Sequence, residues 1–305
     1  MLKQIRREVV SALWNLYCER TPQMQGIAAG MKKRGVSELA LDHFAVIDLP
    51  GPHSGLEVLQ QLFSAIGYLA QGRDYLADKQ NEFLWMTEVD CLDTPVREVL
   101  PQVVVADFRL EELPCEIRKI IEKYSRYVPA SPLADIQRLT GQAFSGDVVA
   151  AEIIRDRLIA YLSARDWPLP SVNEFSTVHE FNELLAWVLV FGRQPNHFTI
   201  SVHLLEGFAK LEQFSQFVGQ ELQFTLNQEG GVIKGGQGAG IAQGSTQGAL
   251  QQVELADGVV QLPTGFVEFV WRYPRKQNPL LWQDFFTDFI AQHANRVIES
   301  LYVVS

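Results

Sequence analysis

One order of predicted elements occurs twice in this 305-residue chain, and this repeat restricts the possible folds more than any other feature. Apolar alternation and turn residues predict a strand, a helix and two further strands at 39–49, 54–66, 83–87 and 103–108. The second copy has a strand, a helix and further strands, predicted at 197–205, 206–218, 222–226, 249–255 and 266–273. The opening strand contains Asp42-His43-Phe44 in the first copy and Asn196-His197-Phe198 in the second. We interpret the shared order as a degenerate internal repeat of a β-α-β-β unit.

The other segments are predicted to be mainly helical. Helical spacing predicts a helix over 3–33 that Pro22 interrupts, and four helices between the copies at 111–127, 132–142, 147–164 and 178–191. The stretch 228–244 is predicted to be a long mobile loop because it is dense in glycine. A phosphate loop is disfavoured there, because the stretch lacks the Gly-Lys-Ser/Thr ending. We expect a single domain with N-terminal helices at 1–38, a first module at 39–110, a helical insertion at 111–191, a second module at 192–275 and a C-terminal helix at 276–305.

Two histidines and one glutamate lie on these apolar strands, namely His43, His197 and Glu268. A carboxylate inside Phe-Val-Glu-Phe-Val is costly to bury unless a metal or a cation meets it. Taken alone, such a glutamate is more often an ion-pair partner or an exposed sheet position, and a strand histidine is more often a hydrogen-bonded core residue. The equivalent positions of the histidines in the repeat favour a facial metal triad, which leaves coordination positions open. We therefore expect an α+β fold in which two related β-α-β-β modules form a curved, mostly antiparallel sheet around a metal site, with helical insertions.

The strand of His197 is predicted to have one polar face. Alternation places Thr199, Ser201 and His203 on the same side as His197. His203 is six residues further on, about 20 Å away along a regular strand. We therefore expect it at the rim of a cavity or behind the metal ligands, and not bonded to the metal. The remaining histidines are predicted to lie outside the site, at His53, His179 and His293.

Composition argues against several classes of protein. The formal charge of −10 disfavours a nucleic-acid partner, because phosphate binding needs a basic face. The longest apolar run, at 184–191, is too short to cross a bilayer, which takes roughly 20 residues. Cys18, Cys91 and Cys115 are odd in number and widely spaced, which fits neither a disulfide framework nor a zinc cluster. We expect a cytoplasmic protein that binds neither nucleic acid nor membranes.

Six short motifs, each weak alone, occur in an order that resembles one known family. They are Asp-His-Phe-Ala at 42–45, Ile-Gly-Tyr at 66–68 with Gly-Arg-Asp-Tyr at 72–75, Pro-Gln-Val-Val-Val-Ala-Asp-Phe at 101–108, Ala-Trp at 186–187 with Asn-His-Phe-Thr-Ile at 196–200, Gln-Gly-Ser-Thr at 243–246 with Val-Glu-Phe at 267–269 and Arg272, and Ala-Asn at 294–295 with Ile-Glu-Ser at 298–300. In this order they resemble the 2-oxoadipate dioxygenase/decarboxylase family, also called 2-hydroxyglutarate synthase. Its fold is similar to that of the vicinal-oxygen-chelate enzymes.

The resemblance implies a catalytic ferrous iron held by His43, His197 and Glu268, with another divalent metal as the alternative. In the family, the iron chelates a 2-oxo acid and activates dioxygen, which couples loss of carbon dioxide to hydroxylation. Arg272 is predicted to stabilise anionic charge near the iron. The candidate catalytic residues that contact the substrate are Ser245, Thr246 and Arg272.

One position departs from the family pattern. The family usually has an arginine four residues after the first histidine, suited to clamping a substrate carboxylate through a bidentate fork, and this chain has Ile47 there. The departure predicts poor activity on 2-oxoadipate and a preference for a 2-oxo acid with an apolar or differently placed distal group. The cations that could replace the missing arginine are Arg73, Lys79 and Arg272.

We predict a non-haem iron(II) dioxygenase/decarboxylase that converts a small 2-oxo acid and dioxygen into a 2-hydroxy acid and carbon dioxide. Two alternatives stay open. The first is a divalent-metal isomerase, lyase or hydrolase on the same fold, which would consume no oxygen. The second is a non-catalytic descendant that binds the metal without turnover.

Overall fold

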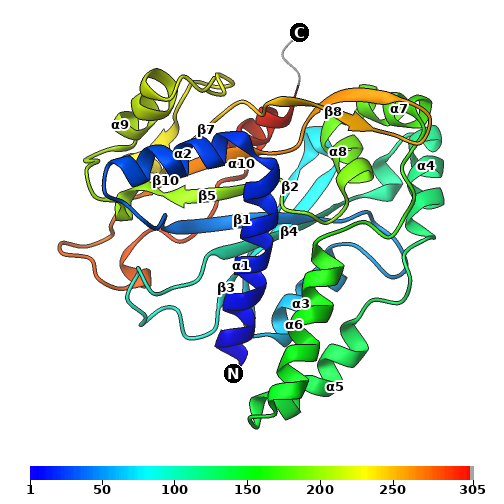
Figure 1. The fold of residues 1–305 in the computed structure, drawn as a ribbon, viewed down its shortest axis with the longest axis horizontal. Coiled ribbons are helices and arrows are strands. Elements are labelled where there is room, and N and C mark those ends of the chain that lie inside the picture. The colour runs from blue at the N-terminus through cyan, green and yellow to red at the C-terminus, as the bar shows by residue number, and fades with distance from the viewer. Residues whose placement is uncertain (303–305) are drawn as a thin grey trace.

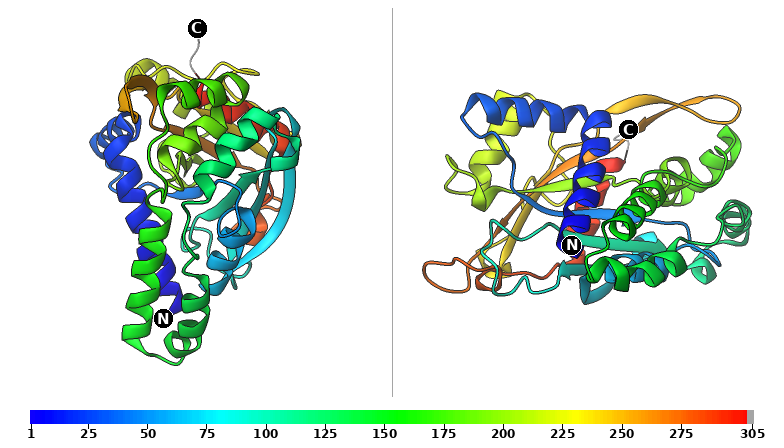
Figure 2. Two further views of the ribbon diagram at one scale, coloured as in Figure 1. Left: turned by 90° about the vertical axis from the view of Figure 1, so that its right-hand side faces the viewer. Right: turned by 60° about the horizontal axis from the view of Figure 1, so that its bottom comes forward.

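An eight-stranded sheet lies at the centre of the computed structural model, which describes residues 1–302 (Figure 1). Its strand order is β2-β3-β4-β1-β5-β10-β7-β6. The strands are β1 (Leu41–Ile47), β2 (Tyr68–Leu76), β3 (Asn81–Glu88), β4 (Gln102–Phe108), β5 (His197–Ser201), β6 (Lys234–Gly236), β7 (Ile241–Ser245) and β10 (Phe266–Arg272). Two neighbouring pairs, β1–β4 and β5–β10, are parallel, and the other five are antiparallel. The sheet curls into a half-barrel (Figure 2), so the predicted α+β class with a curved, mostly antiparallel sheet is confirmed.

The sheet consists of two four-stranded halves with the same connectivity. In each half the first strand pairs in parallel with the last, and the intermediate strands follow outward from the last one. The halves join through the antiparallel pair β1–β5, in which Phe44 lies opposite Phe198. Each of these phenylalanines follows a histidine, so the join brings His43 and His197 close together.

Three strands of the sheet lie where the sequence predicts none. β2 is an edge strand with mainly exposed side chains, so it lacks the apolar alternation of a half-buried strand. β6 and β7 lie inside the glycine-dense segment that is predicted to be a loop. Close packing requires glycine there, because a Cβ on Gly244 would lie 2.4 Å from the ring of Phe269.

Two other predicted strands lie outside the sheet. The strand predicted at 222–226 is reduced to an isolated bridge between Leu226 and Thr246. The strand predicted at 249–255 exists as β8 (Leu250–Glu254), but it pairs with β9 (Val259–Pro263) in a separate hairpin.

Ten α-helices occur among the described residues: α1 (Leu2–Arg20), α2 (Pro22–Lys33), α3 (Leu56–Ala65), α4 (Cys115–Ser125), α5 (Leu133–Phe144), α6 (Val148–Leu162), α7 (Val172–Phe181), α8 (Glu183–Phe191), α9 (Leu211–Gln216) and α10 (Ala291–Ile298). The helix predicted at 178–191 is split at Asn182, whose side chain accepts the N–H of Leu185 and caps α8. The helix predicted from 206 begins later, because Gly207 has a φ of +89° that a right-handed helix excludes. Of the helix predicted at 276–305, the part within the described residues is limited to α10, with short 3₁₀ turns on either side, and positions 303–305 of that prediction lie outside the described residues.

The two faces of the sheet pack against different layers. On the outer face, Phe44, Phe198 and Phe269 join an apolar core that α1, α3 and α9 cover. On the inner face, Ile47 and Phe83 belong to a second core that includes residues of α4, α8 and α10. Within residues 1–302, none of the helices has the length and apolarity needed to cross a bilayer.

Candidate metal centre

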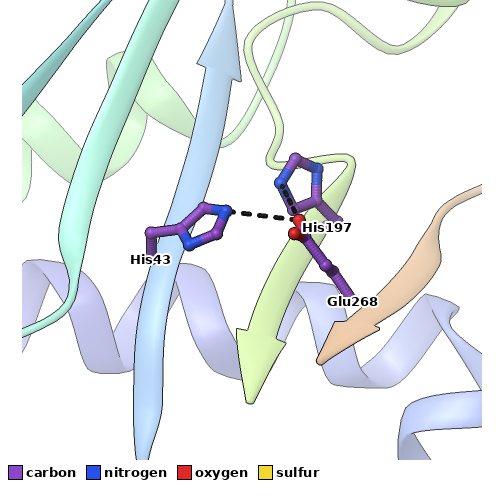
Figure 3. Close-up of side chains that lie close together, drawn as sticks. All are labelled: His43, His197 and Glu268. Carbon is purple, nitrogen blue, oxygen red and sulfur yellow. Dashed lines mark ion pairs between the residues drawn. The ribbon is translucent and has the colours of Figure 1, made fainter. Parts of the chain in front are cut away.

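Side chains from three strands converge on the inner face of the sheet: His43 from β1, His197 from β5 and Glu268 from β10 (Figure 3). Glu268 Oε2 is 3.2 Å from His43 Nε2 and 3.3 Å from His197 Nε2. One ligand atom of each residue lies within 4.8 Å of the other two, and all three side chains are buried. The structure therefore brings together the three residues predicted to hold a metal.

Thr199 explains how the strand register produces this convergence. It lies opposite Glu268 in the parallel β5–β10 pair, and β1 runs along the other side of β5. Its hydroxyl donates to Glu268 Oε2 at 3.0 Å and lies 3.1 Å from His43 Nε2. Thr199 thus supports the cluster from beneath, between two of the candidate ligands.

Both imidazoles are oriented in the same way, by a side-chain oxygen of the preceding residue next to Nδ1. His43 Nδ1 is 2.7 Å from Asp42 Oδ1, and His197 Nδ1 is 2.7 Å from Asn196 Oδ1. An oxygen acceptor at Nδ1 keeps the proton on that nitrogen and leaves the Nε2 lone pair free for a metal. In each copy of the repeat, the residue before the histidine therefore fixes its tautomer, a role that the strand pattern alone does not predict.

Arg272 holds Asp42, the residue that orients His43. Its guanidinium forks onto Asp42, with Nε 2.7 Å from Oδ2 and Nη2 2.9 Å from Oδ1. Its remaining N–H groups donate to Gln102 Oε1 and to the carbonyls of Phe286 and Asp288. These five hydrogen bonds use every donor of a guanidinium, so the geometry favours a positioning role over the predicted contact with substrate.

The carboxylate of Glu268 is held by Gln243. Gln243 Nε2 donates to Glu268 Oε1 at 2.7 Å, which leaves Oε2 directed at the two histidines. Ser245 and Thr246, the other candidate substrate contacts, are fully buried where β7 pairs with β10. Ser245 Oγ pairs with Ser300 Oγ at 2.9 Å, and Thr246 Oγ1 accepts the N–H of Val267. Both hydroxyls thus have protein partners, whereas Gln243 contacts the cluster itself.

His203 lies outside the cluster. β5 ends at Ser201, and His203 belongs to a 3₁₀ turn (Val202–Leu204), where its Nδ1 accepts the backbone N–H of Arg272 at 3.3 Å. Ser201 donates to Asp42 Oδ2 at 3.3 Å. Ser201 therefore belongs to the layer that supports His43.

Without a metal, His43 Nε2 holds a proton at the position where a metal cation would bind. Burial lowers the pKa of His43, but the carboxylates of Glu268 and Asp42 outweigh burial and raise it to about 9. Burial lowers the pKa of His197 to about 4. Burial opposes ionisation of Glu268, yet the charge of His43 brings the pKa of Glu268 down to about 2. A metal bound between Nε2 and Oε2 would displace this proton, because metal ligands bind in the deprotonated form.

A small cavity opens beside the cluster. Its volume is about 50 Å³, which is room for a few waters. Its walls include the three clustered side chains, apolar residues of β1, β3 and β4, and a roof of Phe289, Ala294, Val297 and Ile298. The cluster is therefore buried yet adjacent to a space that a small ligand can occupy.

The donor set fits a divalent transition metal. Two oriented imidazole nitrogens and one carboxylate oxygen face a common point, which is the ligand chemistry of a non-haem iron site. Among the described residues, no fourth His, Cys, Asp or Glu joins this group. Coordination positions would thus stay open toward the cavity.

Comparison with known proteins decides the family. The family model for 2-oxoadipate dioxygenase/decarboxylase matches residues 9–274, which is most of the chain. The chain belongs to this family. A 2-oxoadipate dioxygenase/decarboxylase of Arabidopsis thaliana is 27% identical over 280 residues, which cover 89% of this chain and 70% of the relative.

Solved structures share the fold of this 2-oxoadipate dioxygenase/decarboxylase family member. The hydroxyglutarate synthase of Oryza sativa in complex with 2-oxoadipate has a TM-score of 0.78 and 24% identity, with 98% of this chain and 93% of that chain covered. A Shewanella frigidimarina protein named as a hydrolase has a TM-score of 0.71 and 26% identity, covering 93% and 96%. A glyoxalase superfamily protein from Ralstonia eutropha has a TM-score of 0.74 at 15% identity, with 92% and 84% covered. The expectation that this chain has the fold of the 2-oxoadipate dioxygenase/decarboxylase family is confirmed.

Proposed function

We propose that this family member is a ferrous-iron-dependent dioxygenase/decarboxylase, formed by a single catalytic domain, that acts on a small 2-oxo acid. The observation that carries the proposal is the buried group of His43, His197 and Glu268, with both imidazoles oriented through Nδ1, beside a small cavity. The Arabidopsis relative, named for 2-oxoadipate, supports a 2-oxo acid as the substrate.

The reaction balances with dioxygen as the co-substrate. The bond between C1 and C2 of the 2-oxo acid breaks, and C1 leaves as carbon dioxide. One oxygen atom of dioxygen completes a new carboxylate at C2, and the other becomes a hydroxyl on C3. The product is a 2-hydroxy acid that is one carbon shorter, and the substrate itself supplies the electrons that reduce dioxygen.

The residues of the chain prepare the site for this reaction. His43, His197 and Glu268 would hold the iron, which when bound supplies a Lewis acid for the 2-oxo carboxylate and electrons for dioxygen. Asp42 and Asn196 hold the imidazoles in the metal-binding tautomer. The roof over the cavity, formed in part by Phe289, limits the access of bulk water to the reacting groups.

An oxygen-electrode screen tests the proposal. Anaerobically purified protein would be loaded with ferrous iron and mixed with aerated solutions of 2-oxo acids, with carbon dioxide and the shortened 2-hydroxy acid measured in parallel. We expect equal amounts of oxygen consumed and carbon dioxide released with at least one 2-oxo acid. His179→Ala, on α7 and away from the cluster, serves as the control for His43→Ala, which should abolish oxygen uptake.

Two other outcomes would replace the proposal. Metal-dependent conversion of a substrate without oxygen uptake would indicate an isomerase, lyase or hydrolase. Stoichiometric metal binding without turnover of any 2-oxo acid would indicate a non-catalytic binding protein.

Two further expectations are tested separately. Cell fractionation tests the expected cytoplasmic location, and a binding assay with mixed DNA and RNA tests the expected lack of a nucleic-acid partner.

A further inference from the structure

The cavity extends away from the candidate metal centre along parallel strands of the inner face. β1 and β4 are paired in register, with Ala45 beside Val104 and Ile47 beside Ala106. Ile47 is four residues beyond His43, about 13 Å along the strand. The antiparallel β3 continues this wall, because Phe83 lies opposite Ala106. A substrate held at the metal by the oxygens on its first two carbons would therefore point its distal end at this wall.

The distal wall is apolar. Its lining side chains are Ile47, Leu76, Phe83, Ala106, Val297 and Ile298. The polar residue at this end is Asn81, whose amide donates to the carbonyl of Asp107 at 2.8 Å. Among the described residues that line the cavity, none is an arginine or a lysine.

Two cations close to this wall in the sequence are engaged elsewhere. Arg73 is 46% exposed and pairs with Glu57 and Glu82. Lys79 is buried, but its ammonium lies 2.6 Å from Glu299 Oε1 and over the ring of Tyr302.

Two further cations are buried on the second half of the sheet. Arg272 uses all its donors on Asp42, Gln102 and backbone carbonyls. Lys234 lies opposite Gln243 at the far edge of the sheet, does not line the cavity, and contacts the carbonyl of Asn227 at 3.4 Å. Consistent with these engagements, no arginine or lysine of the described residues lines the distal end of the cavity.

We propose that the site selects 2-oxo acids whose distal group is uncharged and apolar, with Ile47 as a specificity-determining residue. The inference rests on the proposed function, because it takes the metal as the anchor of the 2-oxo acid group. A distal carboxylate, as in 2-oxoadipate, would leave water for an apolar wall without a partner, which is costly. An alkyl group gains from the same burial.

Two acids of equal chain length isolate this effect. 2-Oxohexanoate and 2-oxoadipate differ at the distal carbon alone, which is a methyl group in one and a carboxylate in the other. We expect kcat/KM for 2-oxohexanoate to exceed that for 2-oxoadipate by about tenfold or more, the low end of what an unpaired buried charge costs. Ile47→Arg should shift the ratio toward 2-oxoadipate, while the volume-conserving Ile47→Leu should leave it nearly unchanged.

Binding without turnover separates this inference from the proposed function. Anaerobic titration of the iron-loaded wild-type protein with each acid gives two dissociation constants that do not depend on oxygen chemistry or on the folding of a variant. Tighter binding of 2-oxohexanoate supports the inference even if no acid is turned over. Equal or tighter binding of 2-oxoadipate, or binding of neither acid, overturns it, and turnover of 2-oxoadipate with the higher kcat/KM would overturn the inference while leaving the proposed reaction in place.

Discussion

At the scale of single residues, Asp42 is the side chain that orients His43, its neighbour in the sequence. Successive side chains of a regular strand point to opposite faces, so Asp42 is expected to point away from His43. The register of β1 against β5 is irregular between Leu41 and Phe44, and both Asp42 and His43 are turned toward the inner side. A bulge of this kind places consecutive residues on one face. The irregularity in β1 therefore lets the carboxylate of Asp42 reach the ring of the next residue, His43.

Removal of that carboxylate should weaken the metal site. We expect Asp42→Asn to reduce the affinity for ferrous iron by about 10- to 100-fold, because the acceptor that orients His43 also makes it more basic. The measurement is a competition titration against a chelator under anaerobic conditions. Asp107→Asn is the matched control, since Asp107 accepts the N–H of Leu56 at the start of α3 and does not touch the cluster. Equal affinities of the two variants would contradict the role given to Asp42.

Metal binding should also release a proton. The carboxylates of Glu268 and Asp42 raise the pKa of His43 to about 9, so Nε2 is protonated at neutral pH in the metal-free protein. Because the metal binds the deprotonated ring, about one proton should leave at pH 7, and affinity should rise with pH until about 9 and then level off. Calorimetry in two buffers with different ionisation enthalpies counts the released protons. A count near zero at pH 7, or affinity that falls between pH 6 and 8, would exclude this protonation state.

At the scale of elements, the predictable strands are those with strong apolar patterns, and the missed ones have none. β1, β5 and β10 carry the candidate ligands, and each has buried side chains on both faces. β2 is an exposed edge, and β7 contains Gly244, a residue that propensity alone assigns to loops. The boundaries of the helical insertion were also shifted by local capping at Asn182, which apolar spacing does not show. The three candidate ligands were predictable because they occupy the strongest patterns, while Gln243 was not, because it lies on a missed strand.

The glycine in β7 should be required for stability. Gly244→Ala would place a methyl group 2.4 Å from the ring of Phe269, and overpacking of this kind costs about 1–3 kcal/mol. Gly141→Ala in α5 is the control, because its new Cβ meets no atom within 4 Å and alanine favours a helix. Urea unfolding should show a lower free energy of unfolding for Gly244→Ala and an unchanged or higher one for Gly141→Ala. Equal stability of the two variants would mean that β7 does not pack against β10 as described.

At the scale of the whole molecule, the two halves are equivalent in connectivity but not in ligands. His43 pairs with Gln102 and His197 pairs with Phe266, so the position equivalent to Glu268 in the first half is Val104. Each half supplies a histidine, and the second alone supplies a carboxylate. Val104 lines the cavity, so the ligand missing from the first half leaves room where a substrate would reach the metal. The repeat could be read from the sequence, but this asymmetry needed the register between strands.

The central claim is that His43, His197 and Glu268 together hold a single divalent metal at the join of the two halves. Its most direct test is the metal content of anaerobically purified protein, measured for the wild type, for His43→Ala and for Glu268→Ala, with His179→Ala as the control. We expect about one ferrous iron per chain in the wild type and in the control, and a strong loss in both cluster variants while circular dichroism shows that they stay folded. Full occupancy in His43→Ala and Glu268→Ala would contradict the account, because the metal would then be bound by other residues.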